Sequence, residues 1–181
     1  MLIQTGAPAP LFTALDHSGN RIATEDFKGK WLLLSFLRNG ACAICNLHVR
    51  KLIQQFPKLQ SQGLEIITVF ESPLASIQQY VGTQDAPFSI IPDPDAELYA
   101  LYGVESSAEK TQATMSKPET PAVIAEAAAQ GFALTPEEGS NFHRMPAEFL
   151  IRPNGTVEIA HYANYVYDHM EFDVLEKAIS V

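Results

Sequence analysis

The sequence predicts an α/β fold in which a central mixed sheet is flanked by helices on both faces. Segments of strand character alternate with segments of helical periodicity along the chain, which is the order expected of such a fold. Two of the strand segments are continuous apolar runs, the pattern of strands buried on both faces. The chain has 181 residues, of which 46% are hydrophobic and 18% charged. This size and composition suit a single globular domain over residues 1–181.

Short β segments are predicted at the N-terminus, where prolines and glycines divide the chain at 11–13 and 21–23. Residues 31–37, Trp-Leu-Leu-Leu-Ser-Phe-Leu, form the first buried strand. Apolar residues then recur at helical spacing, so a helix is predicted from about residue 42 to residue 62. Gly63 ends this helix, and Pro57 kinks or weakens it.

The remaining elements follow from the same signals. Ser72 and Pro73 predict a helix start, with the serine as cap and the proline at the first helical position. Pro153-Asn154-Gly155 predicts a hairpin turn. The predicted elements are a buried strand at 64–70, a helix to about Val81, a strand at 88–91, a helix with Leu98, Leu101 and Tyr102 against the core, strands at 148–152 and 156–161, and a helix over 168–179.

Residues 105–141 differ in composition from the rest of the chain. Ser, Thr, Ala, Glu and Pro dominate there, and one helix is predicted over 121–130, stopped by Gly131. The segment has too few apolar side chains for a core of its own, so we interpret it as an insertion in the single domain. It covers the active-site cleft, forms a dimer arm or is a mobile loop, and the sequence leaves these three interpretations open.

The most informative residues are Cys42 and Cys45, the only cysteines of the chain, at the junction between the strand 31–37 and the following helix. A C-x-x-C at such a junction is typical of a thioredoxin-like redox motif. Residues three apart on a helix have Cβ atoms roughly 5–6 Å apart, so the two sulfurs can close a disulfide. The helix N-terminus favours a thiolate at Cys42. Cys45 lies one turn deeper on the apolar stripe and is expected to be less exposed.

Two other roles are conceivable for the cysteine pair, a structural disulfide and a metal site. A structural disulfide is disfavoured because closing so short a loop gives little entropic stabilisation. A metal site is the stronger alternative, since His48 extends the spacing to Cys42, Cys45 and His48. Structural zinc takes four ligands, and only the distant His143 could supply the fourth. We therefore favour redox chemistry, interpret His48 as a helix-surface histidine, and predict no bound metal and no cofactor.

Charge and terminal composition restrict the partners. The net charge of −9 argues against nucleic acid and against anionic membrane surfaces. The N-terminus shows no signal-peptide pattern, and no run reaches the ~20 apolar residues of a membrane helix. A cytoplasmic location is expected, and in that reducing compartment a C-x-x-C is more often catalytic than structural.

Several stretches, in this order along the chain, resemble the alkyl hydroperoxide reductase/thiol-specific antioxidant family, the peroxiredoxins and their relatives, in the branch that keeps a C-x-x-C. These stretches are 6–12 (Gly-Ala-Pro-Ala-Pro-Leu-Phe), 19–20, 27–31, 35–47 around the cysteines, 93–98, 102–104 and 145–151. The resemblance implies a thioredoxin-like fold with a peroxiredoxin-type N-terminal β extension and a possible homodimer. It also implies that Pro146 belongs to the site, with a cis Met145–Pro146 bond that packs on the cysteines and leaves the preceding backbone free for substrate.

The sequence departs from both branches of this resemblance. When the peroxidase motif is aligned on Cys45, Cys42 stands at the position of its threonine and Arg38 at the position of its proline. Pro146 stands at the position of the arginine that polarises the peroxide. Arg38 or Arg144 would have to take that role. In the comparison with thioredoxins, Ser35 stands near the position of the buried carboxylate that transfers protons. Serine cannot do this work, so proton transfer needs water or another group.

The sequence therefore predicts a thiol–disulfide oxidoreductase. Cys42 attacks a disulfide substrate, Cys45 resolves the mixed disulfide, and a cellular dithiol reductant reduces the pair again. The first alternative is a thiol-dependent peroxidase that reduces hydroperoxides, with Cys45 attacking by alignment or Cys42 by exposure. The second is a catalytically weak binding or scaffold module that uses the insertion as its contact surface.

Overall fold

The computed structural model describes residues 2–180. Its elements are, in chain order, β1 (Thr13–Leu15), β2 (Arg21–Ala23), the 3-10 helix η1 (Thr24–Phe27), β3 (Trp31–Phe36), α1 (Ala43–Ser61), β4 (Leu64–Phe70), α2 (Leu74–Gln79), the 3-10 helix η2 (Val81–Gln84), β5 (Ser89–Pro92), α3 (Glu97–Tyr102), α4 (Ala108–Met115), α5 (Thr120–Ala129), β6 (Ala147–Ile151), β7 (Val157–Tyr162) and α6 (Phe172–Ile179). None of the helices in residues 2–180 is both long enough and apolar enough to cross a membrane.

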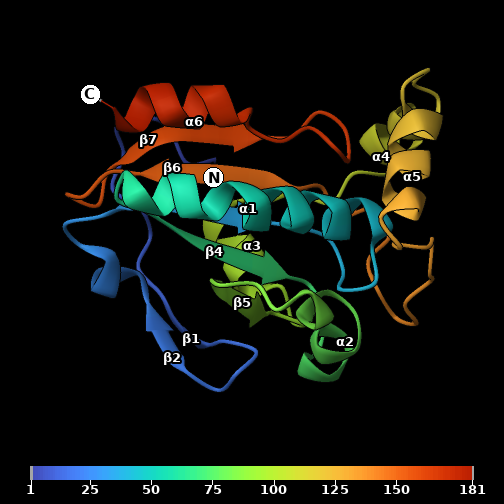
Figure 1. The fold of residues 1–181 in the computed structure, drawn as a ribbon, viewed down its shortest axis with the longest axis horizontal. Coiled ribbons are helices and arrows are strands. Elements are labelled where there is room, and N and C mark those ends of the chain that lie inside the picture. The colour runs from blue at the N-terminus through green and yellow to red at the C-terminus, as the bar shows by residue number, and fades with distance from the viewer. Residues whose placement is uncertain (1, 181) are drawn as a thin grey trace.

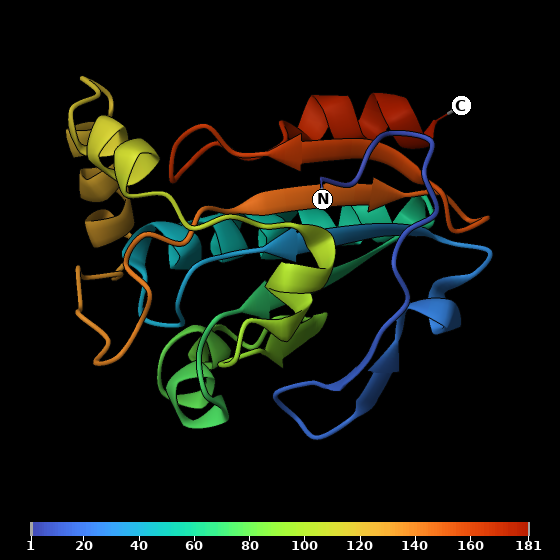
Figure 2. The ribbon, with the colours of Figure 1, turned by 180° about the vertical axis from the view of Figure 1, so that it is seen from behind.

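The centre of the molecule is a mixed sheet with strand order β5-β4-β3-β6-β7. Strands β3, β4 and β5 are parallel to one another, and β6 pairs antiparallel with both β3 and β7. Helices α1 and α6 cover one face, and α3 covers the other (Figures 1 and 2). The antiparallel pair β1-β2 forms the N-terminal extension as a separate small sheet. The predicted fold class, a thioredoxin-like mixed sheet with this extension, is confirmed.

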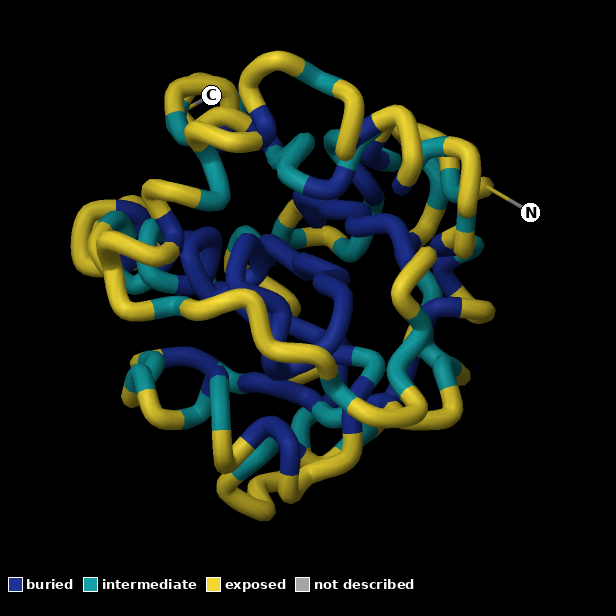
Figure 3. Tube along the Cα trace, turned by 90° about the vertical axis from the view of Figure 1, so that its right-hand side faces the viewer, coloured by how far each residue is buried: buried dark blue, intermediate teal, exposed yellow. Residues whose placement is uncertain are grey.

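The two cores follow from the alternation of side chains along β3. Leu33 and Leu37 point toward α1 and α6, whereas Leu32, Leu34 and Phe36 pack against the face that α3 covers. Both sets are almost completely buried. Figure 3 shows this buried centre surrounded by exposed connecting segments. A strand with apolar residues on both faces therefore forms the middle of the sheet, as its continuous apolar run predicts.

Helix α1 begins and ends where the sequence predicts. Cys42 is its N-cap residue, and Gln62 is its C-cap residue. Gly63 follows with a φ of +85°, a left-handed conformation that glycine adopts at low cost. Pro57 lies inside the helix, also as predicted. The helix thus carries the cysteine pair at one end, beside the carboxyl ends of β3, β4 and β5.

Some predicted details are wrong, and local hydrogen bonds explain two of them. Helix α2 has no serine cap, because the Ser72 hydroxyl instead accepts the N–H of Gly40, 2.9 Å away. Helix α6 begins at Phe172 rather than at Asp168, whose carboxylate accepts the N–H of Asn164.

The other differences concern register and facing. On α3 it is Tyr99 that is buried with Tyr102, because these two residues, three apart, share the helix face that is turned to the core, while Leu101 is 44% exposed. The first short strand, predicted at 11–13, lies at 13–15.

The insertion, predicted over 105–141, leaves the domain at Glu105 and returns to it at Met145, and the two ends lie side by side. Met145 N–H donates to the Glu105 carbonyl oxygen at 3.0 Å, and Ser107 N–H donates to that of His143 at 2.8 Å. Between these pairings lie α4, which the sequence analysis missed, and the predicted α5. Ala127 of α5 packs against α1, at the end where α1 begins (Figure 1).

Candidate active site

Cys42 occupies the N-cap position of α1. Its sulfur accepts the backbone N–H of Cys45 at 3.2 Å, which satisfies one of the unpaired donors of the first turn. The positive end of the helix dipole also lies here. Both effects stabilise a thiolate more than a thiol, so the position is suited to a nucleophilic sulfur.

Cys42 and Cys45 are joined as a disulfide, with Cα atoms 5.2 Å apart. Cys42 is 8% exposed and lines the pocket described below, whereas Cys45 is 1% exposed and lies in the core between α1 and the sheet. One sulfur therefore faces a ligand-sized space, and its partner lies behind it. This is the arrangement that the sequence predicts for a dithiol exchanger.

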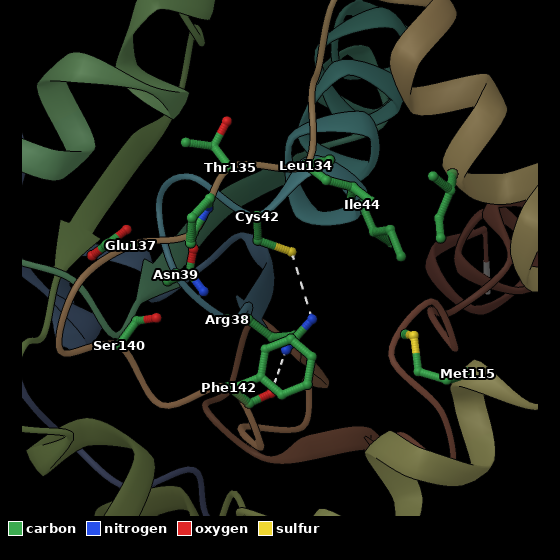
Figure 4. A pocket seen from close by; sticks show the side chains of 13 residues that line it. Arg38, Asn39, Cys42, Ile44, Met115, Leu134, Thr135, Glu137, Ser140 and Phe142 are labelled. Carbon is green, nitrogen blue, oxygen red and sulfur yellow. Dashed lines mark hydrogen bonds between the residues drawn. The ribbon is translucent and has the colours of Figure 1, made fainter.

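Arg38 places a positive charge beside Cys42. It follows β3 directly, and its Nη1 lies 4.0 Å from the Cys42 sulfur (Figure 4). Its Nη2 donates to the carbonyl oxygen of Phe142 in the insertion, and the Phe142 ring lies over the guanidinium. Burial lowers the pKa of Arg38 to about 10, so the side chain still carries its charge at neutral pH. On reduction, a thiolate at Cys42 would lie within 4.0 Å of this charge and could balance it.

The loop between β3 and α1 is held by side chains from three segments. The Asn46 amide donates to the carbonyl oxygens of Gly40 and Cys42 at 2.8 and 3.0 Å. The Glu137 carboxylate of the insertion accepts the Ala41 N–H at 3.3 Å and the Ser72 hydroxyl at 2.7 Å. The insertion is therefore attached directly to the loop that presents Cys42.

A pocket of about 440 Å³ opens over Cys42. Most of its wall is apolar, and the insertion supplies Met115, Ile124, Leu134 and Phe142 (Figure 4). Arg38 and Glu137 are the charged side chains among its described lining residues. Of the three interpretations of the insertion, the structure favours the first, because insertion residues line the pocket over Cys42. A space of this size and character suits a small, largely apolar ligand.

A buried polar cluster lies below α1, where sequence reasoning placed none. Glu148 of β6 is 1% exposed, and its carboxylate accepts the Ser35 hydroxyl at 2.8 Å. His48 Nε2 lies 2.8 Å from the same carboxylate oxygen. His48 is therefore buried and paired, and its prediction as a surface histidine is wrong. Ser35 cannot act as a proton-transferring acid, but its hydroxyl is hydrogen-bonded to the Glu148 carboxylate, which can carry a negative charge.

The charge on Glu148 is stabilised locally. Burial raises the pKa of this carboxyl, but interaction with His48 and His169 outweighs burial and holds the pKa well below its usual range. The Met170 N–H also donates to Glu148, at 2.6 Å. Burial lowers the pKa of His169 to about 4, so that imidazole is neutral at neutral pH.

The predicted metal alternative is not assembled. Cys42 and Cys45 are bonded to each other, and His143 is exposed and does not line the pocket. Within residues 2–180, the group of side chains with metal-ligand spacing is a different one, His48, Glu148 and His169.

Comparison with known proteins identifies the family. The model of the AhpC/TSA family matches residues 5–160. The chain belongs to the AhpC/TSA family. The family assignment made from the N-terminal, cysteine and C-terminal stretches is thereby confirmed.

The proteins that this AhpC/TSA member resembles in sequence include thiol-disulfide oxidoreductases named ResA and proteins named putative peroxiredoxin bcp. The thiol-disulfide oxidoreductase ResA of Bacillus thuringiensis subsp. konkukian is 31% identical over 104 residues, which are 56% of this chain and 59% of that protein. Among solved structures, peroxidoxin BcpB from Mycobacterium tuberculosis superposes with a TM-score of 0.67 at 12% identity, covering 98% of this chain and 95% of that one.

The thioredoxin domain of a thiol-disulfide oxidoreductase from Bacteroides vulgatus superposes with a TM-score of 0.57 at 17% identity, over 98% of this chain and 99% of that one. These structural likenesses show the shared fold. The match to ResA spans about three-fifths of that relative's length.

The AhpC/TSA resemblance implied a cis bond before Pro146, and this expectation is wrong. The Met145–Pro146 bond is trans, since residues 2–180 contain no cis peptide. Met145 packs in the same cluster as both cysteines, but its N–H is already bonded to Glu105 at the base of the insertion. The Met145 N–H is thus not free to pair with a substrate. Pro146 is buried and does not line the pocket, so its part in the site stays a prediction.

The two arginines proposed to replace the family's peroxide-polarising arginine are now distinguished. Arg144 pairs with Glu71, donates to the Val104 carbonyl oxygen at 2.8 Å and lies over the Tyr99 ring. It is therefore a structural residue at the base of the insertion. Arg38 is the arginine that lies beside Cys42 and lines the pocket.

Proposed function

We propose that the chain is a thiol–disulfide oxidoreductase that cycles Cys42 and Cys45 between the dithiol and the disulfide. The observation that carries this proposal is the asymmetry of the pair. Cys42 faces the pocket from the N-terminus of α1 with Arg38 beside it, and Cys45 is buried behind it. The likeness to ResA, a thiol-disulfide oxidoreductase, supports the same chemistry.

The catalytic cycle has two exchange steps. The Cys42 thiolate attacks one sulfur of a disulfide substrate, forms a mixed disulfide and releases the other sulfur as a thiolate. The Cys45 thiolate then attacks the Cys42 sulfur, so the second substrate thiol leaves and the Cys42–Cys45 disulfide forms. A cellular dithiol reverses the oxidation by the same two steps, and the pair is ready again.

The chain's own groups favour the first step in this cycle. Arg38 and the Cys45 N–H both stabilise negative charge on the Cys42 sulfur. When Cys42 is the leaving group during reduction, the same contacts help it to depart, because a sulfur of low pKa leaves faster.

Single cysteine variants test this order of attack. In Cys45→Ser, the attacking sulfur remains but the resolving one is lost, so incubation with a small disulfide should leave a stable mixed disulfide on Cys42, visible as added mass. Cys42→Ser should form little or none, because the remaining sulfur is buried. Equal labelling of both variants, or labelling of Cys42→Ser alone, would contradict the assignment.

A thiol peroxidase is the second candidate, and the position of Arg38 favours it. A cation 4.0 Å from the nucleophilic sulfur can also polarise a bound hydroperoxide. Cys42 would take one oxygen as a sulfenic acid, releasing the alcohol or water, and Cys45 would condense with it to give the disulfide and water.

The rate of thiol loss to hydrogen peroxide decides between these activities and the scaffold alternative. Loss many-fold faster than that of free cysteine supports the peroxidase. Loss at the rate of free cysteine, together with fast exchange with disulfides, supports the oxidoreductase. Cysteines inert to both reagents would leave only the binding module.

The homodimer and the cytoplasmic location stay predictions. Sedimentation velocity tests the homodimer, and cell fractionation tests the location.

A further inference from the structure

Two buried side chains and one partly buried side chain from distant parts of the chain meet below α1. His48 belongs to α1, Glu148 belongs to β6, and His169 lies in the segment before α6. Their candidate ligand atoms all lie within 4.8 Å of one another. The set lies outside the pocket over Cys42, so the cysteine chemistry does not account for it.

The carboxylate is held in one orientation. The Ser35 hydroxyl and the Met170 N–H donate to the two different oxygens of the Glu148 carboxylate, at 2.8 and 2.6 Å. Hydrogen bonds of this kind from outside a ligand set fix its first ligands and are typical of metal centres in proteins. The Ser35 and Met170 bonds remain intact if His48 turns from the carboxylate to another partner.

His169 is the unexplained member. Its side chain is only 10% exposed, and neither ring nitrogen has a hydrogen-bond partner within residues 2–180. Its Nδ1 lies 3.6 Å from the Glu148 carboxylate, beyond hydrogen-bond length. The ring is stacked on that of His48, with centroids 3.5 Å apart. A largely buried imidazole whose two nitrogens make no hydrogen bond, and which lies beside a carboxylate, is suited to bind a metal ion.

Two imidazoles and one carboxylate are a metal-binding set. With three protein ligands, such a set leaves coordination positions open to water or a small molecule. A separate cavity of about 140 Å³ adjoins His48 and His169 and provides that space. Because the lone pairs of imidazole lie in the ring plane, the two stacked rings must splay to reach one ion. His169 can turn, since no hydrogen bond holds it.

We propose that His48, Glu148 and His169 bind one divalent first-row transition-metal ion, with zinc as the reference ion. Glu148 supplies the negative charge, the two imidazoles supply nitrogen, and Ser35 positions the carboxylate. The site is independent of the thiols, although His48 lies one helical turn after Cys45.

The test uses the oxidised protein, because the Cys42–Cys45 disulfide prevents the sulfurs from acting as ligands. Protein treated with a chelator and then freed of it is titrated with Zn²⁺ by calorimetry and with Co²⁺ by absorption. We expect saturable binding of one equivalent and a higher melting temperature with Zn²⁺. His169→Ala should weaken Zn²⁺ binding by more than about tenfold, and Ser35→Ala should weaken it by about tenfold.

His143→Ala is the matched control, because it removes an exposed histidine outside the set and should leave Zn²⁺ binding unchanged. His169→Gln replaces His169→Ala if the alanine variant does not fold. Absence of Zn²⁺ binding to the oxidised wild-type protein would overturn the proposal. Binding that survives in the His169 variants would overturn it as well, because the ion would then lie elsewhere. Neither result bears on disulfide exchange at Cys42.

Discussion

Arg38 joins the reactive sulfur to the insertion that covers it. One guanidinium nitrogen lies 4.0 Å from the Cys42 sulfur, and another donates to the Phe142 carbonyl oxygen. The charge that favours the thiolate is therefore also the charge that holds the cover in place. Any change at Arg38 alters both the chemistry and the pocket.

Replacing Arg38 by methionine should raise the pKa of the Cys42 thiol by about one unit or more, because the nearest cation is removed. The pH dependence of alkylation of the reduced protein by iodoacetamide measures this pKa. Arg152→Met is the control, since Arg152 pairs with Glu158 at an exposed hairpin. An unchanged pKa in Arg38→Met would show that the helix N-terminus alone sets the reactivity.

The same substitution should stabilise the oxidised protein. The folded-state pKa of Arg38 lies below its unfolded value, so the cost of burying the charge is fully present below pH 10, including at neutral pH. An apolar side chain of similar length removes that cost, and we expect the free energy of unfolding to rise by on the order of 1 kcal/mol. Thermal denaturation of the oxidised forms measures the change. A lower melting temperature would mean that the contact with Phe142 outweighs the burial cost.

Glu137→Ala should loosen the insertion without disturbing the sheet. The substitution removes the acceptor of the Ala41 N–H and of the Ser72 hydroxyl. We expect faster hydrogen exchange at Ala41 and across 132–142, and faster labelling of reduced Cys42 by bulky thiol reagents. Glu138→Ala, at the exposed neighbouring position, should match the wild-type protein. Equal exchange in the two variants would contradict a role for Glu137 in holding the cover.

The apolar wall of the pocket should contribute to substrate binding. Leu134 is 66% exposed in the free protein and lines the pocket. Covering this side chain with a small aromatic disulfide is worth about 1 kcal/mol, so Leu134→Ser should raise KM about fivefold and leave kcat unchanged. Leu15→Ser, at a similarly exposed leucine of β1, is the control. A fall in kcat with constant KM would place Leu134 in the reacting geometry instead.

Tyr99 should stabilise the start of the active-site loop. Its hydroxyl lies 2.6 Å from the Leu37 carbonyl oxygen and 3.0 Å from that of Val69, where β3 and β4 end. Tyr99→Phe leaves these buried acceptors without that donor, so the free energy of unfolding should fall by roughly 1–2 kcal/mol. Denaturant titration measures this, with Tyr80→Phe as a control whose hydroxyl bonds only at the surface. Equal stability of the two variants would contradict the role of Tyr99.

Sequence reasoning succeeded where the determinants are local. The apolar run of β3 requires burial on both faces, and the position of Cys42 at a strand-to-helix junction follows from residues within one turn of it. These signals predict the central strands of the sheet, the bounds of α1 and the cysteine pair. The same holds for the hairpin at 153–155, whose turn residues specify their own geometry.

The missed features depend on contacts between distant parts of the chain. Glu148 appears in the sequence as one acidic residue within an apolar strand, and its partners His48 and Ser35 lie 100 and 113 positions away. A carboxylate inside an otherwise buried strand was the available signal, because such a charge requires partners. Likewise Ser72 was predicted as a cap, but it bonds with Gly40 and Glu137, which no local pattern indicates.

The insertion starts and ends at the two paired positions Glu105 and Met145, so its ends are held together by the domain itself. A replacement segment of another length would begin and finish at the same anchor, and loop-closure entropy changes only slowly with length. We therefore expect that other segments can replace the cover over Cys42 between the same two anchors. Grafting other segments between these anchors offers a route to retarget the cysteine pair to new reactants while the sheet, α1 and the nucleophile stay as they are.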